Sequence, residues 1–344
     1  MKKSLETESS EKNKKYKKNN EPHAHAVKIY FIYRQGTAEP IELEKIEDYL
    51  SRKDGFIWVD IQASHPQKNI FQLTFIPKHI AKVLSALETR PRSEVIPEGL
   101  LLNLRSLDLI KIHMNPEPSD MISLRLWMNE QILVSVHRRP IHFMEKLISQ
   151  INQDVLINNS IDILKLMLEE ILQHLSDTTL ELTDHIDILE DDFEQSVREK
   201  RHKLSIYRRQ IISIRRYLLP QREALLRLPI DKILWLSDLQ KLNLREASDG
   251  TTRVLEDLET AKDRSVLLQE ELLNITQEQI NNKIFLLSIV AVIFMPLSFI
   301  TGLLGINVGG IPGAEHTDGF WVVCVMLAVL MAIEIGVLRY IKWV

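Results

Sequence analysis

Residues 284–304 read IFLLSIVAVIFMPLSFITGLL, and residues 320–338 read FWVVCVMLAVLMAIEIGVL. The two stretches are 21 and 19 residues long, and a helix of roughly 20 residues is needed to cross a hydrocarbon layer about 30 Å thick. The first stretch contains no Asp, Glu, Lys, Arg or His, and the second contains only Glu334. The sequence therefore predicts two membrane-spanning helices, at 284–304 and 320–338.

The rest of the chain has the composition of a protein that folds in water. The 344 residues contain 43 Lys and Arg against 47 Asp and Glu, for a formal net charge of -4. Two apolar stretches beside a large water-soluble remainder exclude both a carrier with many spans and a purely cytosolic enzyme. The single cysteine, Cys324, lies in the second span, so neither a disulfide framework nor a cysteine-based zinc site can form. The fold class is an α+β membrane protein, with a large soluble part on a two-helix anchor.

Residues 1–26 are predicted to form a disordered tail. Seven Lys and four Glu fall among the first 21 residues, and no apolar stretch is present there. Residues 27–142 predict a cytoplasmic α/β domain, since short β-branched and aromatic runs surround one helical pattern. The expected strands are Val27–Tyr33, Phe56–Ile61, Leu100–Ile110, Met121–Asn129 and Gln131–His137, and the expected helix is Pro77–Leu87.

Residues 143–283 predict a cytoplasmic helical domain that ends in a stalk helix. Apolar residues recur at three- and four-residue spacing over Ser160–Phe193, which is acidic, and Arg198–Leu226, which is basic. One interpretation is an antiparallel hairpin whose facing charges pair, each pair contributing only about 0.3–0.5 kcal/mol. The other is a cation-sensing surface, because clustered carboxylates suit hard divalent ions.

A single helix is expected from about Leu242 to Leu304, because no proline precedes Pro296 and Gly250 is the only breaker. At helical rise this helix is on the order of 90 Å long, too long for its own domain to cover. The natural partners of such a helix are copies of itself. Its length therefore predicts a homo-oligomer.

One face of the first span carries small and hydroxylated residues. At about 100° per residue, Ser288, Ala291, Met295, Ser298 and Gly302 fall within an arc of roughly 100°. Such a face either lets helices pack closely or borders a water-accessible lumen. Periodicity alone leaves both interpretations open.

The link between the spans, residues 305–319, predicts a periplasmic loop. It contains two carboxylates, four glycines after Gly305, and no Lys or Arg. Basic residues flank the spans on the other side, so the positive-inside tendency places both chain ends, including the tail 339–344, in the cytoplasm. An acidic loop at an outer mouth raises the local cation concentration. The flanking basic residues are Lys283, Arg339 and Lys342.

The sequence Gly305-Ile306-Asn307 directly after a proline-containing span, followed by Val-Gly-Gly-Ile-Pro-Gly, resembles the CorA-type metal ion transporter superfamily. In that superfamily the outer end of the first membrane helix carries Gly-Met-Asn. The Ile variant with a glycine-rich loop is similar to the ZntB zinc-transport branch. Residues 88–92 (ETRPR), 123–127 (SLRLW) and 134–140 (VSVHRRP) support the match, which covers about residues 27–344.

The resemblance implies a homopentameric funnel in the bacterial inner membrane. Five first helices would line the pore, the second helices would form an outer ring, and the soluble domains would lie in the cytoplasm. Ile284 and Leu287 become candidate hydrophobic gates that close by dewetting. The complete pore face implied is Ile284, Leu287, Ala291, Met295, Ser298 and Gly302, which is nearly the face that the helical wheel gives.

The resemblance also assigns Gly305, Ile306 and Asn307 to an outer selectivity ring. Five Asn307 side chains would offer neutral amide oxygens to the water shell of a divalent ion, which suits Mg²⁺ and also zinc moving as a hydrate. The function implied is divalent cation transport, with zinc uptake favoured and a CorA-like magnesium or cobalt channel as the alternative. Proton coupling is expected from the ZntB resemblance only. No cofactor is expected, because zinc, Mg²⁺ or Co²⁺ is the transported substrate.

The pore face contains no His, Cys, Asp or Glu, so tight zinc ligation is not available there. Outside it, Glu315, His316 and Asp318 are either a cation-attracting mouth or a solvated part of the loop. Glu259 falls on the pore side of the stalk. It either faces a cytoplasmic pore or forms a salt bridge to Lys262 or Lys283.

Glu334 is the one carboxylate within the spans, where such groups are functional candidates by default. The alternative is that it extends toward Arg339 or Lys342 at the membrane surface. No nucleophile elbow, phosphate-binding glycine loop or His/carboxylate metal motif is present, which argues against an enzyme. The rival of another class is a non-conducting, membrane-tethered oligomeric scaffold. The partners expected are further copies of the chain, the lipid bilayer and divalent cations, with no nucleic acid.

Overall fold

The computed structural model describes residues 26–34, 36–62, 73–86, 90–107, 121–151, 157–192, 196–228, 232–233, 235–306, 311 and 317–341. All of the predicted tail 1–26 except Ala26 lies outside these residues. The chain divides into two compact units, Met1–Leu268 and Gln269–Val344. One helix, α9 (Asp238–Leu304), runs through the boundary between them.

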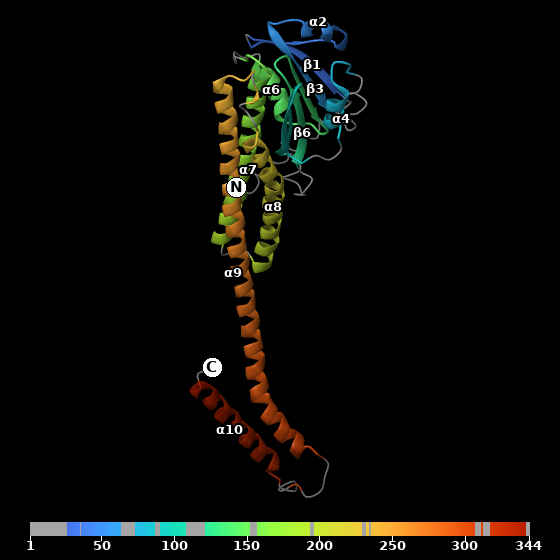
Figure 1. Ribbon diagram of the computed structural model, residues 1–344. Coiled ribbons are helices and arrows are strands. Elements are labelled where there is room, and N and C mark those ends of the chain that lie inside the picture. The colour runs from blue at the N-terminus through green and yellow to red at the C-terminus, as the bar shows by residue number, and fades with distance from the viewer. Residues whose placement is uncertain are drawn as a thin grey trace. The chain divides into compact units, whose positions relative to one another are not determined.

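A seven-stranded sheet is the centre of the first unit in the described part of the chain, with the order β2-β1-β3-β7-β6-β5-β4. β3 and β7 are parallel, and all other neighbours are antiparallel. One parallel pair therefore joins two antiparallel groups (Figure 1). The strands are β1 (Ala26–Tyr33), β2 (Ala38–Pro40), β3 (Gly55–Gln62), β4 (Arg92–Ile96), β5 (Gly99–Leu107), β6 (Met121–Met128) and β7 (Ile132–His137).

All five predicted strands are confirmed, as β1, β3, β5, β6 and β7. The sequence did not predict β2 and β4, which are the two edge strands. β2 has only three residues, and no residue of β4 is fully buried. Neither strand therefore has the apolar alternation by which a strand is recognised. The predicted helix Pro77–Leu87 is confirmed as α4 (Lys78–Leu84).

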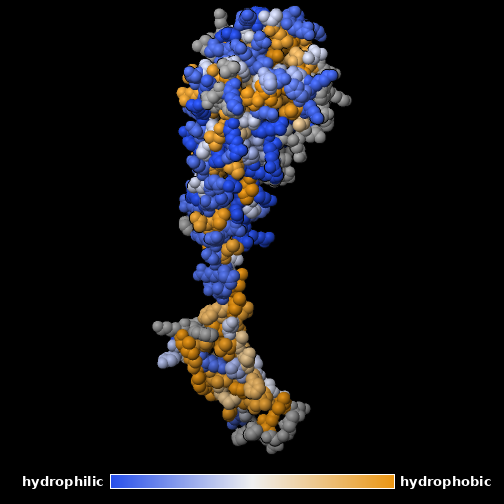
Figure 2. Space-filling model, in the orientation of Figure 1, coloured by the Kyte–Doolittle hydropathy of each residue, from blue (hydrophilic) through white to orange (hydrophobic). Residues whose placement is uncertain are grey.

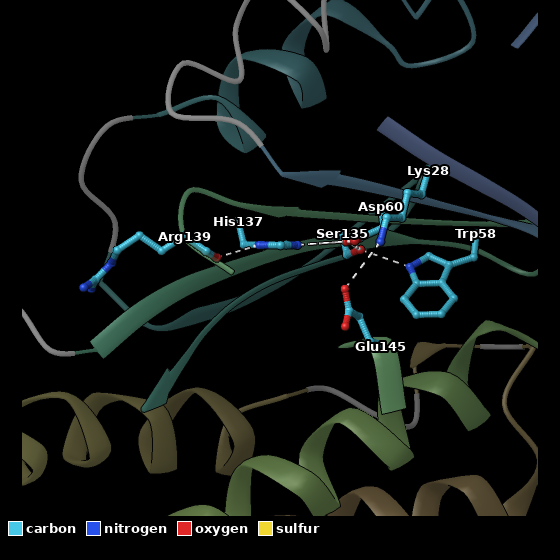
Figure 3. A network of polar contacts seen from close by, with 7 residues as sticks. All are labelled: Lys28, Trp58, Asp60, Ser135, His137, Arg139 and Glu145. Carbon is cyan, nitrogen blue, oxygen red and sulfur yellow. Dashed lines mark hydrogen bonds and ion pairs between the residues drawn. The ribbon is translucent and has the colours of Figure 1, made fainter. Parts of the chain in front are cut away.

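One face of the sheet is covered by α4 and by α2 (Ile46–Leu50), which follows a 3-10 turn, η1 (Leu43–Lys45). Strand residues such as Phe31 and Val134 are fully buried against Ile80 of α4. Burying an apolar side chain of this size stabilises the domain by about 1.5–3 kcal/mol. Alternate strand residues point to the other face, on the side of α6 (Phe143–Ile151; Figure 3).

Helices α7 (Ser160–Asp191) and α8 (Val197–Leu226) confirm the two predicted helical segments after residue 160. The side chain of Asn159 caps α7, with Asp162 completing a capping box, and Ser196 caps α8. Each cap satisfies an N–H group that the first helical turn leaves without a partner. The predicted single long helix is confirmed as α9, which continues without interruption through Pro296.

Ion pairs connect both α7 and α8 to the first part of α9. Arg264 of α9 binds Asp187 at 2.5 Å and Glu190 at 2.7 Å, both on the acidic helix α7. Arg215 of the basic helix α8 binds Glu259 of α9. At least part of the acidic and basic charge predicted for the hairpin is therefore paired with α9. The cation-sensing interpretation of the acidic helix stays a prediction.

The second unit contains the end of α9 and α10 (Gly319–Tyr340). Both helices contain windows with a mean hydropathy of 2.6, so both are long and apolar enough to cross a membrane. Only 0% and 6% of those windows are buried within the chain. Figure 2 shows this apolar surface as a continuous region over the two helices.

Candidate functional site

The six predicted pore positions all lie on an exposed face of α9. Ile284, Leu287 and Met295 are 56%, 69% and 71% exposed. Ala291, Ser298 and Gly302 are also exposed, and no atom lies within 4 Å of the point where a Cβ on Gly302 would be. Nothing in the same chain therefore covers this face among the described residues.

From Ile289 onward the opposite face of α9 is the less exposed one, although Leu286, on the same face, is 62% exposed. Leu297 is 8% exposed, and Ile289, Ile293, Ile300 and Leu304 are half-buried. At about 100° per residue these positions lie roughly 180° around the helix from the pore positions. α10 is the helix of this unit that can cover them, since it turns back after the link (Figure 1). The predicted pore face is thus directed away from α10.

The hydroxyl groups of this span differ in what they bind. Ser288 donates to the Ile284 carbonyl at 2.9 Å, and Thr301 donates to the Leu297 carbonyl at 3.0 Å. The Ser298 hydroxyl has no hydrogen bond to any described residue. It is therefore the hydroxyl of the predicted pore face that is available to water or to a hydrated ion.

α9 ends at the predicted selectivity motif. The Gly305 N–H donates to the Thr301 carbonyl at 2.9 Å, and a Cβ on Gly305 would lie 3.0 Å from that oxygen. The close approach explains why glycine suits this position. Ile306 is 49% exposed, and Asn307 lies outside the described residues. The last carbonyls of a helix carry partial negative charge, so this end of α9 favours a cation.

The predicted mouth residues Glu315 and His316 also lie outside the described residues. Asp318 immediately precedes α10, and its carbonyl accepts a hydrogen bond from the Val322 N–H at 3.1 Å. Its carboxylate makes no capping bond to the helix. Whether the three residues form one cation-attracting mouth stays a prediction.

Glu259 is bound on two sides. Lys262 donates to its carboxylate at 2.7 Å, and Arg215 of α8 donates to the other oxygen. The Lys262 bond, and then Arg215, hold the pKa of Glu259 below its usual range against a smaller opposing effect of burial. The salt bridge to Lys262, the alternative raised by the sequence, is therefore present, and Glu259 stays charged at neutral pH. Its predicted place in a cytoplasmic pore remains a prediction.

Glu334 has a different environment in α10. One of its carboxylate oxygens, Oε2, is buried and has no hydrogen-bond partner in the described chain. Among the described residues, Glu334 and Arg339 do not form an ion pair. Lys342 lies outside the described residues. More broadly, no group of three or more His, Cys, Asp or Glu side chains in the described chain is placed to hold a metal ion.

A buried polar network in the sheet was missed by the sequence analysis. The Ser135 hydroxyl accepts from the Trp58 indole at 3.0 Å and donates to Asp60 at 2.5 Å. His137 Nε2 lies 3.2 Å from the same carboxylate oxygen, and its Nδ1 lies 2.7 Å from the Arg139 carbonyl (Figure 3). The available signal was the presence of Asp60 in β3 and of Ser135 and His137 in β7, two strands that are otherwise mostly apolar.

The surroundings of His137 favour its protonated, cationic form. Both of its ring nitrogens face acceptors, so both must carry a proton to make both bonds. Burial acts to lower the pKa of His137, but the charge and hydrogen bond of Asp60 and the Arg139 carbonyl together raise it above the ordinary value. When His137 is protonated, it forms a buried ion pair with Asp60 that links β3 to β7.

Comparison with known proteins identifies the family. A family model described as "CorA-like Mg2+ transporter protein" matches residues 53–339. This chain belongs to that family. The match includes the strands from β3 to β7, the helical bundle, α9 and most of α10, while β1 and β2 precede it. The CorA-like chain therefore has both soluble and apolar parts in common with the family.

Individual relatives agree with this assignment. The zinc transport protein ZntB of Pectobacterium carotovorum is 28% identical over 321 residues, which are 93% of this CorA-like chain and 97% of that protein. The full-length CmaX structure is 26% identical with a TM-score of 0.77, over 94% of this chain and 100% of that one. The CorA magnesium transporter of Methanocaldococcus jannaschii is 20% identical with a TM-score of 0.75, over 93% and 99%, and shows a shared fold.

Proposed function

We propose that this CorA-like chain transports a divalent metal cation across a membrane, with zinc as the favoured cargo. The observation that carries the proposal is the exposed apolar face of α9, on which Ile284, Leu287 and Met295 are 56–71% exposed. The relatives support the choice of ion, because the proteins similar over 93% of the chain are zinc transport proteins. A magnesium or cobalt channel is the alternative, since the family model is named for Mg²⁺.

The pore would be formed by several copies of α9, which we propose to be five. A face that carries Leu287 and Met295 at about 70% exposure cannot stay in water, and partner helices or lipid must cover it. Copies arranged around an axis would turn Ser298 and Gly302 toward a lumen and Ile284 and Leu287 toward its narrow apolar part. Dewetting between such apolar side chains is enough to close a pore.

Selection would occur at the outer end of this pore. Gly305, Ile306 and Asn307 follow the negative end of α9, and an Asn ring offers amide oxygens to a hydrated divalent ion. Glu315, His316 and Asp318 would raise the cation concentration at the entrance. Under this proposal both chain ends are in the cytoplasm and the protein is in the bacterial inner membrane.

Flux into liposomes tests the proposal. The full chain is reconstituted, a metal-sensitive dye is enclosed, and Zn²⁺, Mg²⁺ and Co²⁺ are added outside in turn, with and without an inward proton gradient. Zinc flux that grows with the gradient supports the ZntB-like function and proton coupling. Magnesium or cobalt flux that ignores the gradient supports the channel alternative. No flux of any ion from a folded oligomer supports the scaffold instead.

Asn307→Ala is expected to abolish or deregulate flux while the oligomer still assembles, because the ring of amide oxygens is lost. The matched control is Asn282→Ala, which removes the same kind of side chain from α9. At 100° per residue, Asn282 lies about 160° around the helix from Ile284 and so away from the predicted pore face. Flux and the oligomer mass are measured for both variants. Unchanged ion selectivity and rate in Asn307→Ala would rule out the proposed selectivity ring.

A further inference from the structure

Arg125, in the middle of β6, is a fully buried arginine with two unpaired guanidinium nitrogens in the described chain. It is 0% exposed, and its Nε and Nη1 atoms make no hydrogen bond. Its backbone lies opposite Asn103 on β5 and Val136 on β7. Val136 belongs to the core under α4, so Arg125 points to this face, away from the Asp60 network.

Arg138 is the second arginine of this group. It directly follows β7, which ends at His137, and its charge acts on Arg125, so the two guanidinium groups lie near one another. Its Nε and Nη2 atoms are buried and make no hydrogen bond, although the residue as a whole is only half-buried. These two nitrogens form one edge of the guanidinium, which matches a pair of oxygens on a carboxylate, phosphate or sulfate.

The surroundings add positive charge and a further donor. Burial, and then the charges of Arg138 and Arg105, lower the pKa of Arg125 to about 10. Arg105 and Arg139 both donate to the Met121 carbonyl, at 3.4 Å and 3.2 Å. The buried Trp127 indole N–H, two residues from Arg125 on the same strand, also has no partner in the described chain.

A fully buried guanidinium with unpaired nitrogens, as in Arg125, is unstable by itself. Removing an ion from water costs several kcal/mol unless an opposite charge and hydrogen bonds replace the water. Arginine does not solve this by losing its proton at neutral pH, even with a pKa of about 10. A water molecule could accept hydrogen bonds here but would not neutralise the charge.

We propose that Arg125 and Arg138 bind a small tetrahedral oxyanion of the phosphate or sulfate class within the α/β domain. The exposed side of Arg138 is where the anion enters, and the unpartnered N–H groups of both arginines are its donors. This site lies in the sheet and is independent of the metal cargo. Free phosphate and the phosphate group of a nucleotide share this chemistry.

The test uses the full chain in detergent, in a buffer whose only anion is gluconate. Phosphate, sulfate, ATP and chloride are added separately at equal ionic strength, while thermal unfolding and calorimetric binding are measured. Phosphate or sulfate should raise the unfolding temperature in a saturable way, with binding near one anion per chain. An effect of ATP alone would identify a nucleotide as the source of the oxyanion. An equal effect of chloride, or no saturable binding, would overturn the proposal.

Two variants and one control locate the site. Arg125→Met removes the buried charge while keeping similar volume, so it should lose the phosphate effect and be at least as stable as the parent in gluconate. Arg138→Gln, at a half-buried position, should weaken phosphate binding at least tenfold without unfolding the domain. Arg227→Gln, whose side chain is 80% exposed, removes the same charge elsewhere and should bind normally. Parent-like phosphate binding in both site variants, or marked destabilisation of Arg125→Met in gluconate, would contradict the proposal.

Discussion

Asp60 in the sheet and Glu334 in α10 are both carboxylates among apolar residues, but only one has its hydrogen bonds supplied by the chain. Asp60 is 5% exposed and accepts from Ser135 and His137. Glu334 Oε2 is buried without a partner in the described chain. The chain therefore supplies the polar contacts of Asp60, whereas Glu334 leaves one carboxylate oxygen without a partner among the described residues.

The apolar residues of the two regions differ in the same way. Leu133 of β7 is 0% exposed, whereas Leu287 of α9 is 69% exposed. One chain is enough to bury the sheet, but lipid or further copies must cover the span. The same residue type therefore stabilises the fold in one region and is left for lipid or partner helices to cover in the other, and each substitution below tests that division.

The largest effect is expected from Asp60→Ala. Removing this carboxylate leaves a buried imidazolium and a buried hydroxyl without their partner, which should cost about 3–5 kcal/mol. Glu334→Gln should leave the stability of the soluble part unchanged. Urea unfolding followed by near-ultraviolet circular dichroism measures both. Equal losses of domain stability in the two variants would contradict the expected difference between Asp60 and Glu334.

Leu133→Ala should follow, because a cavity in a closed core costs about 2–5 kcal/mol. Leu287→Ala is the matched change in the span, and it should leave the urea midpoint of the soluble part unchanged. Since Leu287 is a proposed gate, its truncation should instead raise ion leak in the liposome assay. A strong loss of domain stability in Leu287→Ala would contradict the proposed role.

A smaller effect should appear as a pH dependence of the sheet. The folded state raises the pKa of His137, so the stabilisation is fully present below the unfolded value of about 6.5 and is lost as pH rises through the folded value. The parent should therefore lose more stability between pH 6 and pH 9 than His137→Gln does. His202→Gln, on the exposed surface of α8, is the control and should behave like the parent.

The smallest effect is expected at the contact of α8 with α9. Arg215 and Glu259 are 39% and 34% exposed, and such pairs contribute less than about 1 kcal/mol. Arg215→Gln should therefore change the urea midpoint only slightly, and high salt should reduce the difference further. A loss as large as that of Leu133→Ala would mean that this contact is part of the core.

The sequence predicted those parts of the fold that rest on local pattern. Helical periodicity was enough for α7, α8 and α9, and β-branched runs were enough for the five longer strands. These properties depend on neighbours within a few residues, which is why one sequence can reveal them. The pore face given by the helical wheel stays a prediction, because residues outside it, such as Leu286 and Phe299, are also exposed at 62% and 70%.

Contacts between distant residues could not be predicted in this way. Asp60 meets Ser135 and His137 only because β3 pairs with β7 across about 75 residues. Arg125 sits in the alternating run SLRLW, where a charged residue suggests a solvent-facing position, and only the cover on that face reveals its burial. Both sites depend on contacts between segments that are far apart in the sequence.

The parallel pair β3–β7 also sets an order of events during synthesis. The sheet cannot close until His137, the last residue of β7, has left the ribosome. Ile284, the first residue of the apolar span, is made roughly 150 residues later, which at about 5–20 residues per second takes about 7–30 s. The α/β domain therefore has time to fold before any span requires a membrane. A defect in span insertion should consequently yield a folded domain on a mislocalised chain.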